Sequence, residues 1–217
     1  MLEFHNVKVY DLKESVIASR NAMRLDMPEY TDEEFEKGLA RAKKLAKAGG
    51  GSGHSSFRKG IGVSFDMKYT QYITKQFQRY HWFDYISSSS LMHRITQMDF
   101  SKCVNKYVSQ RTVDNMTELI ATYNRFAEER TESHTFVLRE ETIEATTHAD
   151  VLYYQFMLII SECPMGAELF VRVSTNYEQL ATIARQRKHH KLKEDYAAFM
   201  DMIRNLPYGK ELILCEE

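Results

Sequence analysis

The sequence has 217 residues, of which 43% are hydrophobic and 27% charged, and its 29 Lys and Arg against 30 Asp and Glu leave a net charge of −1. This composition excludes wholesale disorder, and the balanced charge argues against a nucleic-acid partner. No apolar run approaches the ~20 residues of a membrane span, so no membrane partner is expected. The N-terminus lacks a signal-peptide pattern and the three cysteines lack CxxC spacing, which predicts a cytoplasmic protein with reduced thiols.

The N-terminal quarter of the chain is predicted to hold one strand and two helices. Loosely alternating apolar residues predict a strand over residues 2–9, and Asp11 is an acceptable N-cap for a helix that runs to about Leu25. Thr31 and Glu34 form a capping box at the start of a second helix, which we expect to end at a glycine tract.

The GGGSG tract over residues 49–53 allows two interpretations. Such a tract is typical of a flexible linker, but its place just before His54 favours a loop at the mouth of a site. After it, residues 61–67 alternate apolar and polar side chains and form the clearest strand signal of the chain. Thr70 then caps a predicted helix, and residues 82–94 are expected to be irregular.

The second half of the sequence is predicted to be mainly helical. Apolar residues recur at helical spacing over residues 113–126, 149–160, 177–184 and 192–203, and the helix over 149–160 is apolar nearly all round, so we expect it to be buried. Pro164 and Pro207 are expected to stop helices, and the charged segment 127–147 is a possible insertion. With only 3 prolines and 9 glycines, we predict one α+β domain over residues 1–217, mostly helical with a small antiparallel sheet.

Standard catalytic and metal-binding motifs are absent from the sequence. It contains no GxxxxGK[ST], no GxGxxG after a strand, no HExxH and no GxSxG. His189 and His190 are adjacent, so on a helix they point about 100° apart and cannot easily share one metal ion. We therefore expect no metal site.

Polar chemistry is concentrated in residues 76–94, around four consecutive serines at positions 87–90. Hydroxyl and backbone N–H groups between cationic side chains make a plausible phosphate cradle, and neighbouring aromatic rings offer flat surfaces for a base or a ring cofactor. The alternative is an ordinary loop. The flanking cationic side chains are Arg79, His81, His93 and Arg94.

A second basic cluster follows later in the chain. Arg172 and Asn176 precede a predicted helix that carries the basic run 185–191, and Arg187 lies nearly three helical turns beyond Tyr177. A charge run on a helix is usually a solvated face. Two separated clusters with polar and aromatic neighbours nevertheless indicate a nucleotide-sized anionic ligand.

The order of these features resembles that of the flavin-dependent thymidylate synthase (ThyX) family, in particular its divergent, phage-like members. A Gly-His-Ser-Ser-Phe turn at residues 53–57 leads into an alternating strand, then a helix ending in Gln76-x-x-Arg79, a Ser-rich motif and a closing Asn…Leu…Arg helix. The resemblance spans residues 7–207, with 127–147 unmatched.

The central signature of the family is altered in this sequence. Arg79 matches its first arginine, whereas Tyr80 and His81 replace the histidine and the second arginine. With a one-residue insertion, Ser90 falls on the signature serine and Ser88 on its glutamate; without the insertion, Ser89 matches the serine. Met92 takes the place of the last arginine, although Arg94 lies close by.

The resemblance implies a role for each matching residue. Arg79 and Ser90 would be catalytic, with the serine a positioning and hydrogen-bonding group and not a nucleophile. The implied flavin-binding residues are His54, Ser56, Arg79, His81 and Asn176. The implied nucleotide-binding residues are Gln76, Ser88, Ser89, Ser90, Arg94, Arg172 and Arg187.

The activity implied by the resemblance is reductive methylation of dUMP to dTMP. It would use FAD, a methylene-folate and NADPH in a homotetramer, in the cytoplasm of the cell or of a phage host. Because the signature is altered, a nucleotide-binding relative stays open as an alternative, either acting on another pyrimidine nucleotide or serving as a regulatory or interaction protein.

Overall fold

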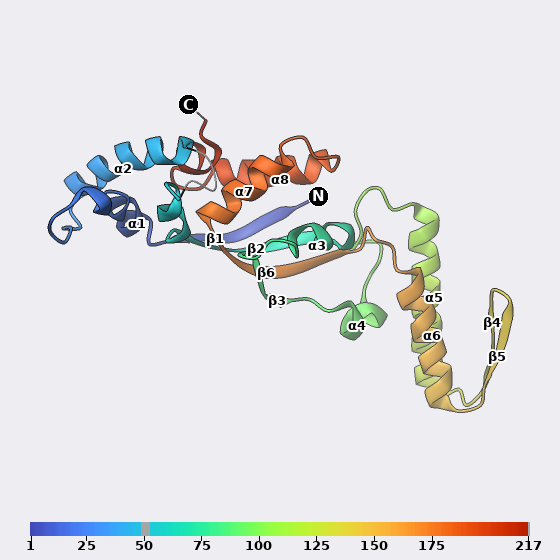
Figure 1. Ribbon diagram of the computed structural model, residues 1–217. Helices are drawn as coiled ribbons and strands as arrows, with labels where there is room; N and C mark the ends of the chain where they lie inside the picture. The colour runs from blue at the N-terminus through green and yellow to red at the C-terminus, as the bar shows by residue number, and fades with distance from the viewer. Residues whose placement is uncertain (49–52, 217) are drawn as a thin grey trace. The chain divides into compact units, whose positions relative to one another are not determined.

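The computed structural model describes residues 1–48 and 53–216. Tertiary contacts divide the chain into two compact units (Figure 1). The first unit comprises Met1–Tyr69, Ile73–Ser88 and Phe170–Glu217, and the second comprises Thr70–Tyr72 and Ser89–Leu169. The predicted linker or loop at residues 49–52 lies outside the described residues, and the prediction of one domain over 1–217 stays a prediction.

A four-stranded sheet forms the base of the first unit. Its order is β1 (Glu3–Tyr10), β2 (Gly62–Thr70), β6 (Glu168–Asn176) and β3 (Asp84–Ser88), and both outer pairs are antiparallel. The strands predicted over 2–9 and 61–67 are confirmed as β1 and β2. No strand is predicted at β6, and the expectation that residues 82–94 are irregular is wrong for Asp84–Ser88, which form β3.

The helices at the N-terminus follow the predicted pattern only in part. The helix expected from Asp11 to Leu25 is α1 (Leu12–Ala18) followed by the short 3-10 turn η1 (Asn21–Met23). Asp11 is the N-cap residue of α1, as predicted, but it has a positive φ of 55° and its side chain makes no capping hydrogen bond in the described residues. By contrast, the hydroxyl of Thr31 accepts a hydrogen bond from the Glu34 N–H and caps α2 (Asp32–Lys47), as predicted.

The remaining helices of the first unit follow the sheet strands in sequence. α3 (Gln71–Phe77) follows β2, and α7 (Tyr177–Arg187) and α8 (Lys193–Arg204) follow β6; α2, α7 and α8 lie on one side of the sheet (Figure 1). α8 ends at Arg204, three residues before Pro207, as expected, and a separate π-helical turn, η4 (Lys210–Leu214), follows. An aromatic core joins the two layers: Phe77 stacks on Phe83 at 4.7 Å and also contacts Phe199.

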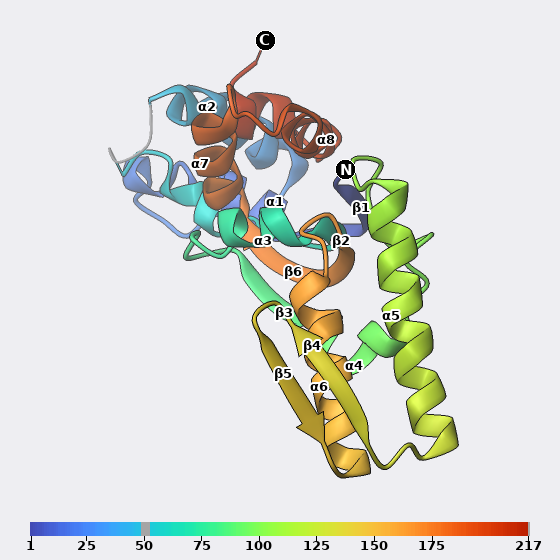
Figure 2. The ribbon, with the colours of Figure 1, turned by 90° about the vertical axis from the view of Figure 1, so that its right-hand side faces the viewer.

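The second unit is built on an antiparallel helix pair (Figure 2). α5 (Gln110–Glu129) and α6 (His148–Glu162) pack together, and the segment 127–147 contains a hairpin of β4 (His134–Leu138) and β5 (Glu141–Ala145). Short turns, α4 (Leu91–Arg94) and η3 (Ile95–Gln97), precede α5. No described helix is both long and apolar enough to pass through a bilayer.

The helix α6 is less buried than its sequence predicts. Val151 and Ile159 are fully buried, and Gln155 is buried with its amide donating to the Leu119 carbonyl at 2.9 Å. On the opposite side of the helix, Tyr153 and Met157 are 57% and 40% exposed. The expectation of a helix buried all round is therefore wrong for the single chain.

Candidate functional site

The helix α7 organises the candidate site of the first unit. Asn176 ends β6 and caps α7, its side-chain oxygen accepting a hydrogen bond from the Gln179 N–H at 2.9 Å. Arg187 lies in the last turn, where the negative end of the helix dipole favours a cation. The helix therefore carries one predicted flavin-binding residue at its start and one predicted nucleotide-binding residue at its end.

The turn between α3 and β3, which carries Arg79 and His81, is hydrogen-bonded to α7 and to the end of β6. The backbone N–H of Trp82 donates to the Gln179 side chain at 3.3 Å, and the Thr175 hydroxyl donates to the Trp82 carbonyl at 2.6 Å. Both contacts join segments about a hundred residues apart in sequence. They fix the backbone of a turn that lies outside helix and strand.

Arg187 is held between two tyrosines in an arrangement that we call the Arg187 clamp, made of Tyr80, Arg187 and Tyr196. The Nε of Arg187 donates to the Tyr80 hydroxyl at 2.8 Å, and that hydroxyl donates to Gln186 Oε1 at 3.1 Å. The guanidinium lies 5.7 Å from the centre of each tyrosine ring, within cation–π range. Neither Nη group of Arg187 has a hydrogen-bond partner among the described residues, so this pre-positioned fork can receive an anionic ligand.

The predicted residues next to Tyr80 share this part of the first unit. Arg79 is exposed and has neither a hydrogen bond nor an ion pair within residues 1–48 and 53–216. His81 packs its ring against Trp82 at 4.6 Å, and Gln76 is half-buried in the last turn of α3. The contact between Tyr80 and Arg187 thus brings the predicted Gln-x-x-Arg segment to the C-terminal end of α7.

The turn that carries His54 and Ser56 meets the other end of α7. Ser56 donates its hydroxyl to the Gly53 carbonyl at 2.7 Å, within the 3-10 turn η2 (Ser56–Lys59). Glu178 accepts from Ser55 at 3.2 Å and forms an ion pair with the buried Arg58 at 2.8 Å. This carboxylate therefore ties the turn to the first turn of α7.

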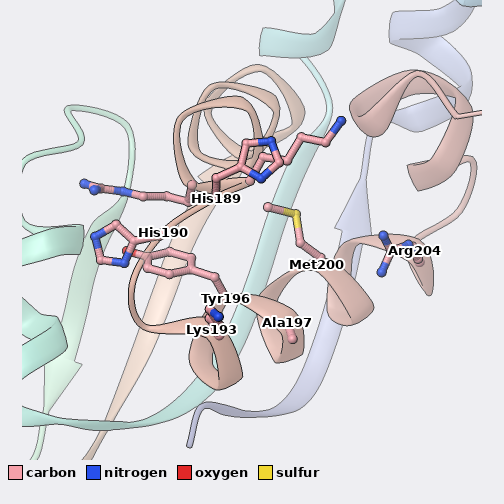
Figure 3. A pocket seen from close by; sticks show the side chains of 9 residues that line it. His189, His190, Lys193, Tyr196, Ala197, Met200 and Arg204 are labelled. Atoms are coloured by element: carbon pink, nitrogen blue, oxygen red, sulfur yellow. The ribbon is translucent and has the colours of Figure 1, made fainter.

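Two of the predicted flavin-binding residues and one of the predicted nucleotide-binding residues line separate pockets in the first unit. His54 and Ser56 border a pocket of about 490 Å³ formed by α1, α2 and η2. Arg187 borders another of about 430 Å³ at the turn between α7 and α8 (Figure 3). Glu178 and Arg187, which mark the two attachment points, are nine residues apart on the helix, roughly 14 Å at 1.5 Å per residue.

Arg172 lies on β6 and already has partners. Its Nη1 contacts Asp66 Oδ1 at 3.1 Å and the Asn6 carbonyl at 3.2 Å, and its Nη2 donates to Ser64 at 2.7 Å. The hydrogen bond from the Asn6 side chain, together with Arg172, lowers the pKa of Asp66. A nucleotide phosphate at Arg172 would have to compete with this carboxylate.

The Ser-rich motif is divided between the two units. Ser88 is exposed at the end of β3 in the first unit, whereas Ser89 and Ser90 begin the second unit. Ser90 stands at the N-cap position of α4 without a side-chain capping bond, and Arg94 is exposed at the end of the same helix. The predicted anion cradle around these serines stays a prediction.

The side chains that position Arg187 are not predicted from the sequence. In the sequence Tyr80 is only a replacement in the family signature, and Tyr196 is only an apolar position of a predicted helix. Tyr196 is 3% exposed, its hydroxyl has no hydrogen-bond partner among the described residues, and burial raises its pKa to about 12. No sequence signal joins Tyr80 to Tyr196, because only the packing of α3, α7 and α8 brings them together.

Comparison with solved structures identifies the fold. The chain is similar to the flavin-dependent thymidylate synthase ThyX of Helicobacter pylori complexed with FAD and dUMP, with a TM-score of 0.65 and 14% sequence identity over 99% of this chain and 100% of that one. A second structure of the Helicobacter pylori ThyX with FAD and dUMP gives a TM-score of 0.62 and 13% identity, over 98% and 97% of the two chains. No protein-family model matches the sequence, and no curated protein matches it.

The chain therefore has an α+β fold of the ThyX type, as the resemblance predicted. At 13–14% identity this similarity concerns the fold alone, and the chemistry has to be argued from the residues.

Proposed function

We propose that this protein is a flavin-dependent thymidylate synthase-like enzyme that converts dUMP to dTMP with a methylene-folate as the carbon donor and NADPH as the source of electrons. The observation that carries the proposal is the Arg187 clamp, placed on a ThyX-type fold at the position where the resemblance expects a nucleotide-binding arginine. We propose that the reaction takes place in the cytoplasm.

In this proposal the nucleotide is held by the C-terminal end of α7 and the turn beside it. The free Nη groups of Arg187 donate to an anionic oxygen of dUMP, and the exposed guanidinium of Arg79 adds a second positive charge. Gln76, Ser88, Ser89, Ser90 and Arg94 remain proposed nucleotide contacts, with Ser90 orienting the substrate. Arg172 can contact the nucleotide only if its guanidinium gives up its hydrogen bonds to Asp66 and Ser64.

The residues proposed to hold FAD offer suitable donors. His54 and Ser56 border a pocket of about 490 Å³, within the ~300–1,000 Å³ of most small-molecule sites, and the Asn176 amide Nδ2 has no partner among the described residues. Arg79 and His81 complete the proposed set. When bound, the reduced flavin supplies the hydride that turns the transferred carbon into a methyl group.

Absorption spectroscopy of the purified protein tests this proposal. A flavin spectrum that intensifies on addition of FAD, followed by dTMP formation from dUMP, methylene-folate and NADPH, is the expected result. The Arg187→Ala variant should keep the flavin spectrum and bind dUMP more weakly, because Arg187 is proposed to contact only the nucleotide. Wild-type protein that binds no FAD would refute the proposal.

The altered signature favours a second candidate, a nucleotide-binding relative without the synthase reaction. Tyr80 stands where the family has a histidine, and its hydroxyl is occupied by Arg187 and Gln186. Such a protein would be stabilised against heat by dUMP or another pyrimidine nucleotide and not by FAD. Thermal shifts with each ligand alone separate the two candidates.

We also propose that the protein assembles as a homotetramer. Tyr153 and Met157 are large apolar side chains on an exposed face of α6, and such faces are commonly covered by a partner subunit, which supports this proposal. Tyr153→Glu should lower the mass measured by light scattering, whereas Glu162→Gln at the end of the same helix should not. An unchanged mass in both variants would exclude this face.

A further inference from the structure

The pocket at the turn between α7 and α8 is strongly basic. Figure 3 shows it between the His189–His190 pair of the turn and the Tyr196, Met200 and Arg204 side chains of α8. Its lining residues include two arginines, two lysines and two histidines, and neither an aspartate nor a glutamate. Asp195, in the first turn of α8, does not line the pocket and instead accepts a hydrogen bond from the Leu2 N–H at 3.0 Å.

Three of the four cations that line this pocket form no ion pair in the described residues, although the Glu216 carboxylate lies near enough to Lys188 to interact with its charge. Arg204 is paired, with Asp201 at 2.8 Å and Glu216 at 3.1 Å. Lys188 and Lys193 form no ion pair within 4 Å in the described part of the chain, and the Nη groups of Arg187 are free there as well. Three cations therefore surround one small cavity, and their mutual repulsion is relieved when an anion enters.

The pocket also offers a neutral donor. The Leu192 N–H donates to His190 Nδ1 at 3.2 Å, so the proton of the neutral imidazole resides on Nε2, which is left as a donor. The His190 ring packs edge-on against Tyr196 at 4.8 Å. Tyr196 also lines the pocket, but its hydroxyl is buried and interacts electrostatically with the buried Tyr85 hydroxyl, so we do not count it among the donors.

We infer that this pocket binds a phosphate group with two or more negative charges, held by Lys188, His190 and Lys193 together with the Nη groups of Arg187. A charged fork, two ammonium groups and an imidazole N–H match the several acceptor oxygens of a phosphate better than the two of a carboxylate. The phosphate is carried either by the nucleotide of the proposed function or by a separate phosphorylated ligand. The inference does not require the synthase activity, because it rests on the α7–α8 turn itself.

Titration calorimetry of the full chain with pyrophosphate as the probe tests the inference. Lys188→Ala and Lys193→Ala should each raise the Kd for pyrophosphate about 3- to 10-fold, since each removes one charge-assisted contact. Lys44→Ala is the matched control, because Lys44 is an exposed lysine on α2 without an ion pair in the described residues, and its Kd should not change. No binding below ~10 mM, or an equal loss in the control, would overturn the inference.

A parallel titration with dUMP identifies the source of the phosphate. An equal loss of dUMP affinity in the two lysine variants assigns the pocket to the nucleotide's own phosphate, whereas unchanged dUMP affinity assigns it to a separate ligand. Protein that binds pyrophosphate but not dUMP would retain the pocket and refute the proposed function. Protein that binds dUMP through Arg187 but does not bind pyrophosphate would refute the phosphate pocket and leave the proposed function intact.

Discussion

Arg172 and Arg187 lie on consecutive elements, β6 and α7, and the structure gives them opposite surroundings. Arg172 contacts a carboxylate, a backbone carbonyl and a hydroxyl, so both of its Nη groups are occupied. Arg187 lies against two aromatic rings, and within residues 1–48 and 53–216 it donates only through its Nε, to the Tyr80 hydroxyl. The difference teaches that an arginine is available to a ligand when its neighbours fix its position without using its charge.

Replacement of Arg187 should have the largest effect on ligand binding. Arg187→Ala removes both Nη groups and a positive charge, so the Kd for dUMP should rise about 10- to 100-fold. Arg187→Lys should recover only part of this loss, because an ammonium group cannot form a bidentate contact. Calorimetry with dUMP measures both variants. An unchanged Kd in Arg187→Ala would show that Arg187 is not the arginine available to the nucleotide.

Removal of the Tyr80 hydroxyl tests whether the clamp positions Arg187. Tyr80→Phe keeps the ring but deletes a hydroxyl that accepts from Arg187 and donates to Gln186. We expect the free energy of unfolding to fall by about 1 kcal/mol and the Kd for dUMP to rise about 3- to 10-fold. Tyr30→Phe, at an exposed tyrosine, is the control; equal effects in the two variants would exclude a positioning role.

Arg172→Ala should affect stability more than binding, and less than Tyr80→Phe does. The folded-state pKa of Asp66 is lowered by its hydrogen bonds to Asn6 and Arg172, so its contribution to stability is present above its unfolded pKa of about 3.9 and is lost as the pH falls through the folded value. Urea unfolding at pH 7 and pH 3 should therefore show a smaller difference between wild type and variant at pH 3. A large loss of dUMP affinity would instead assign Arg172 to the nucleotide.

The smallest expected effect concerns His190 beside Arg187. Partial burial, and then the nearby charges of Arg187 and Lys191, lower the pKa of His190 from its ordinary value of about 6.5. Because the unfolded chain binds this proton more readily, the group reduces stability below about pH 6.5 and has no effect at pH 8. An NMR titration should give a value below 6.5, and pyrophosphate should raise it; a value that pyrophosphate does not change would separate His190 from the anion pocket.

Local sequence signals predicted several elements well. The Thr31 cap is set by residues three positions apart, and the alternation of 61–67 is set by one buried face of β2, so both could be read without tertiary information. In β6, Val171, Val173 and Thr175 alternate with Phe170, Arg172 and Ser174, a signal that was present and overlooked. β3 carries a weaker signal, because most of this short outer strand is exposed.

The candidate site was predictable as a set of residue types and not as an arrangement. The sequence analysis selected Gln76, Arg79 and Arg187, and the structure brings their segments together at one end of α7. It did not anticipate that His54 and Ser56 attach at the other end of that helix, through Glu178. Nor could it tell that Arg172 is neutralised by Asp66, which is more than a hundred residues away in sequence.

The sequence by itself determined the elements whose signals are local, namely the capped helices, the alternating strands and the ThyX-like order of motifs. The tertiary structure decided which charges are free, because pairing depends on the long-range packing that places Asp66 beside Arg172 and two tyrosines beside Arg187. The sequence around Arg172 or Arg187 does not indicate which distant side chain each one contacts. The availability of each charge to a ligand is settled only when distant segments compete for it in the folded protein.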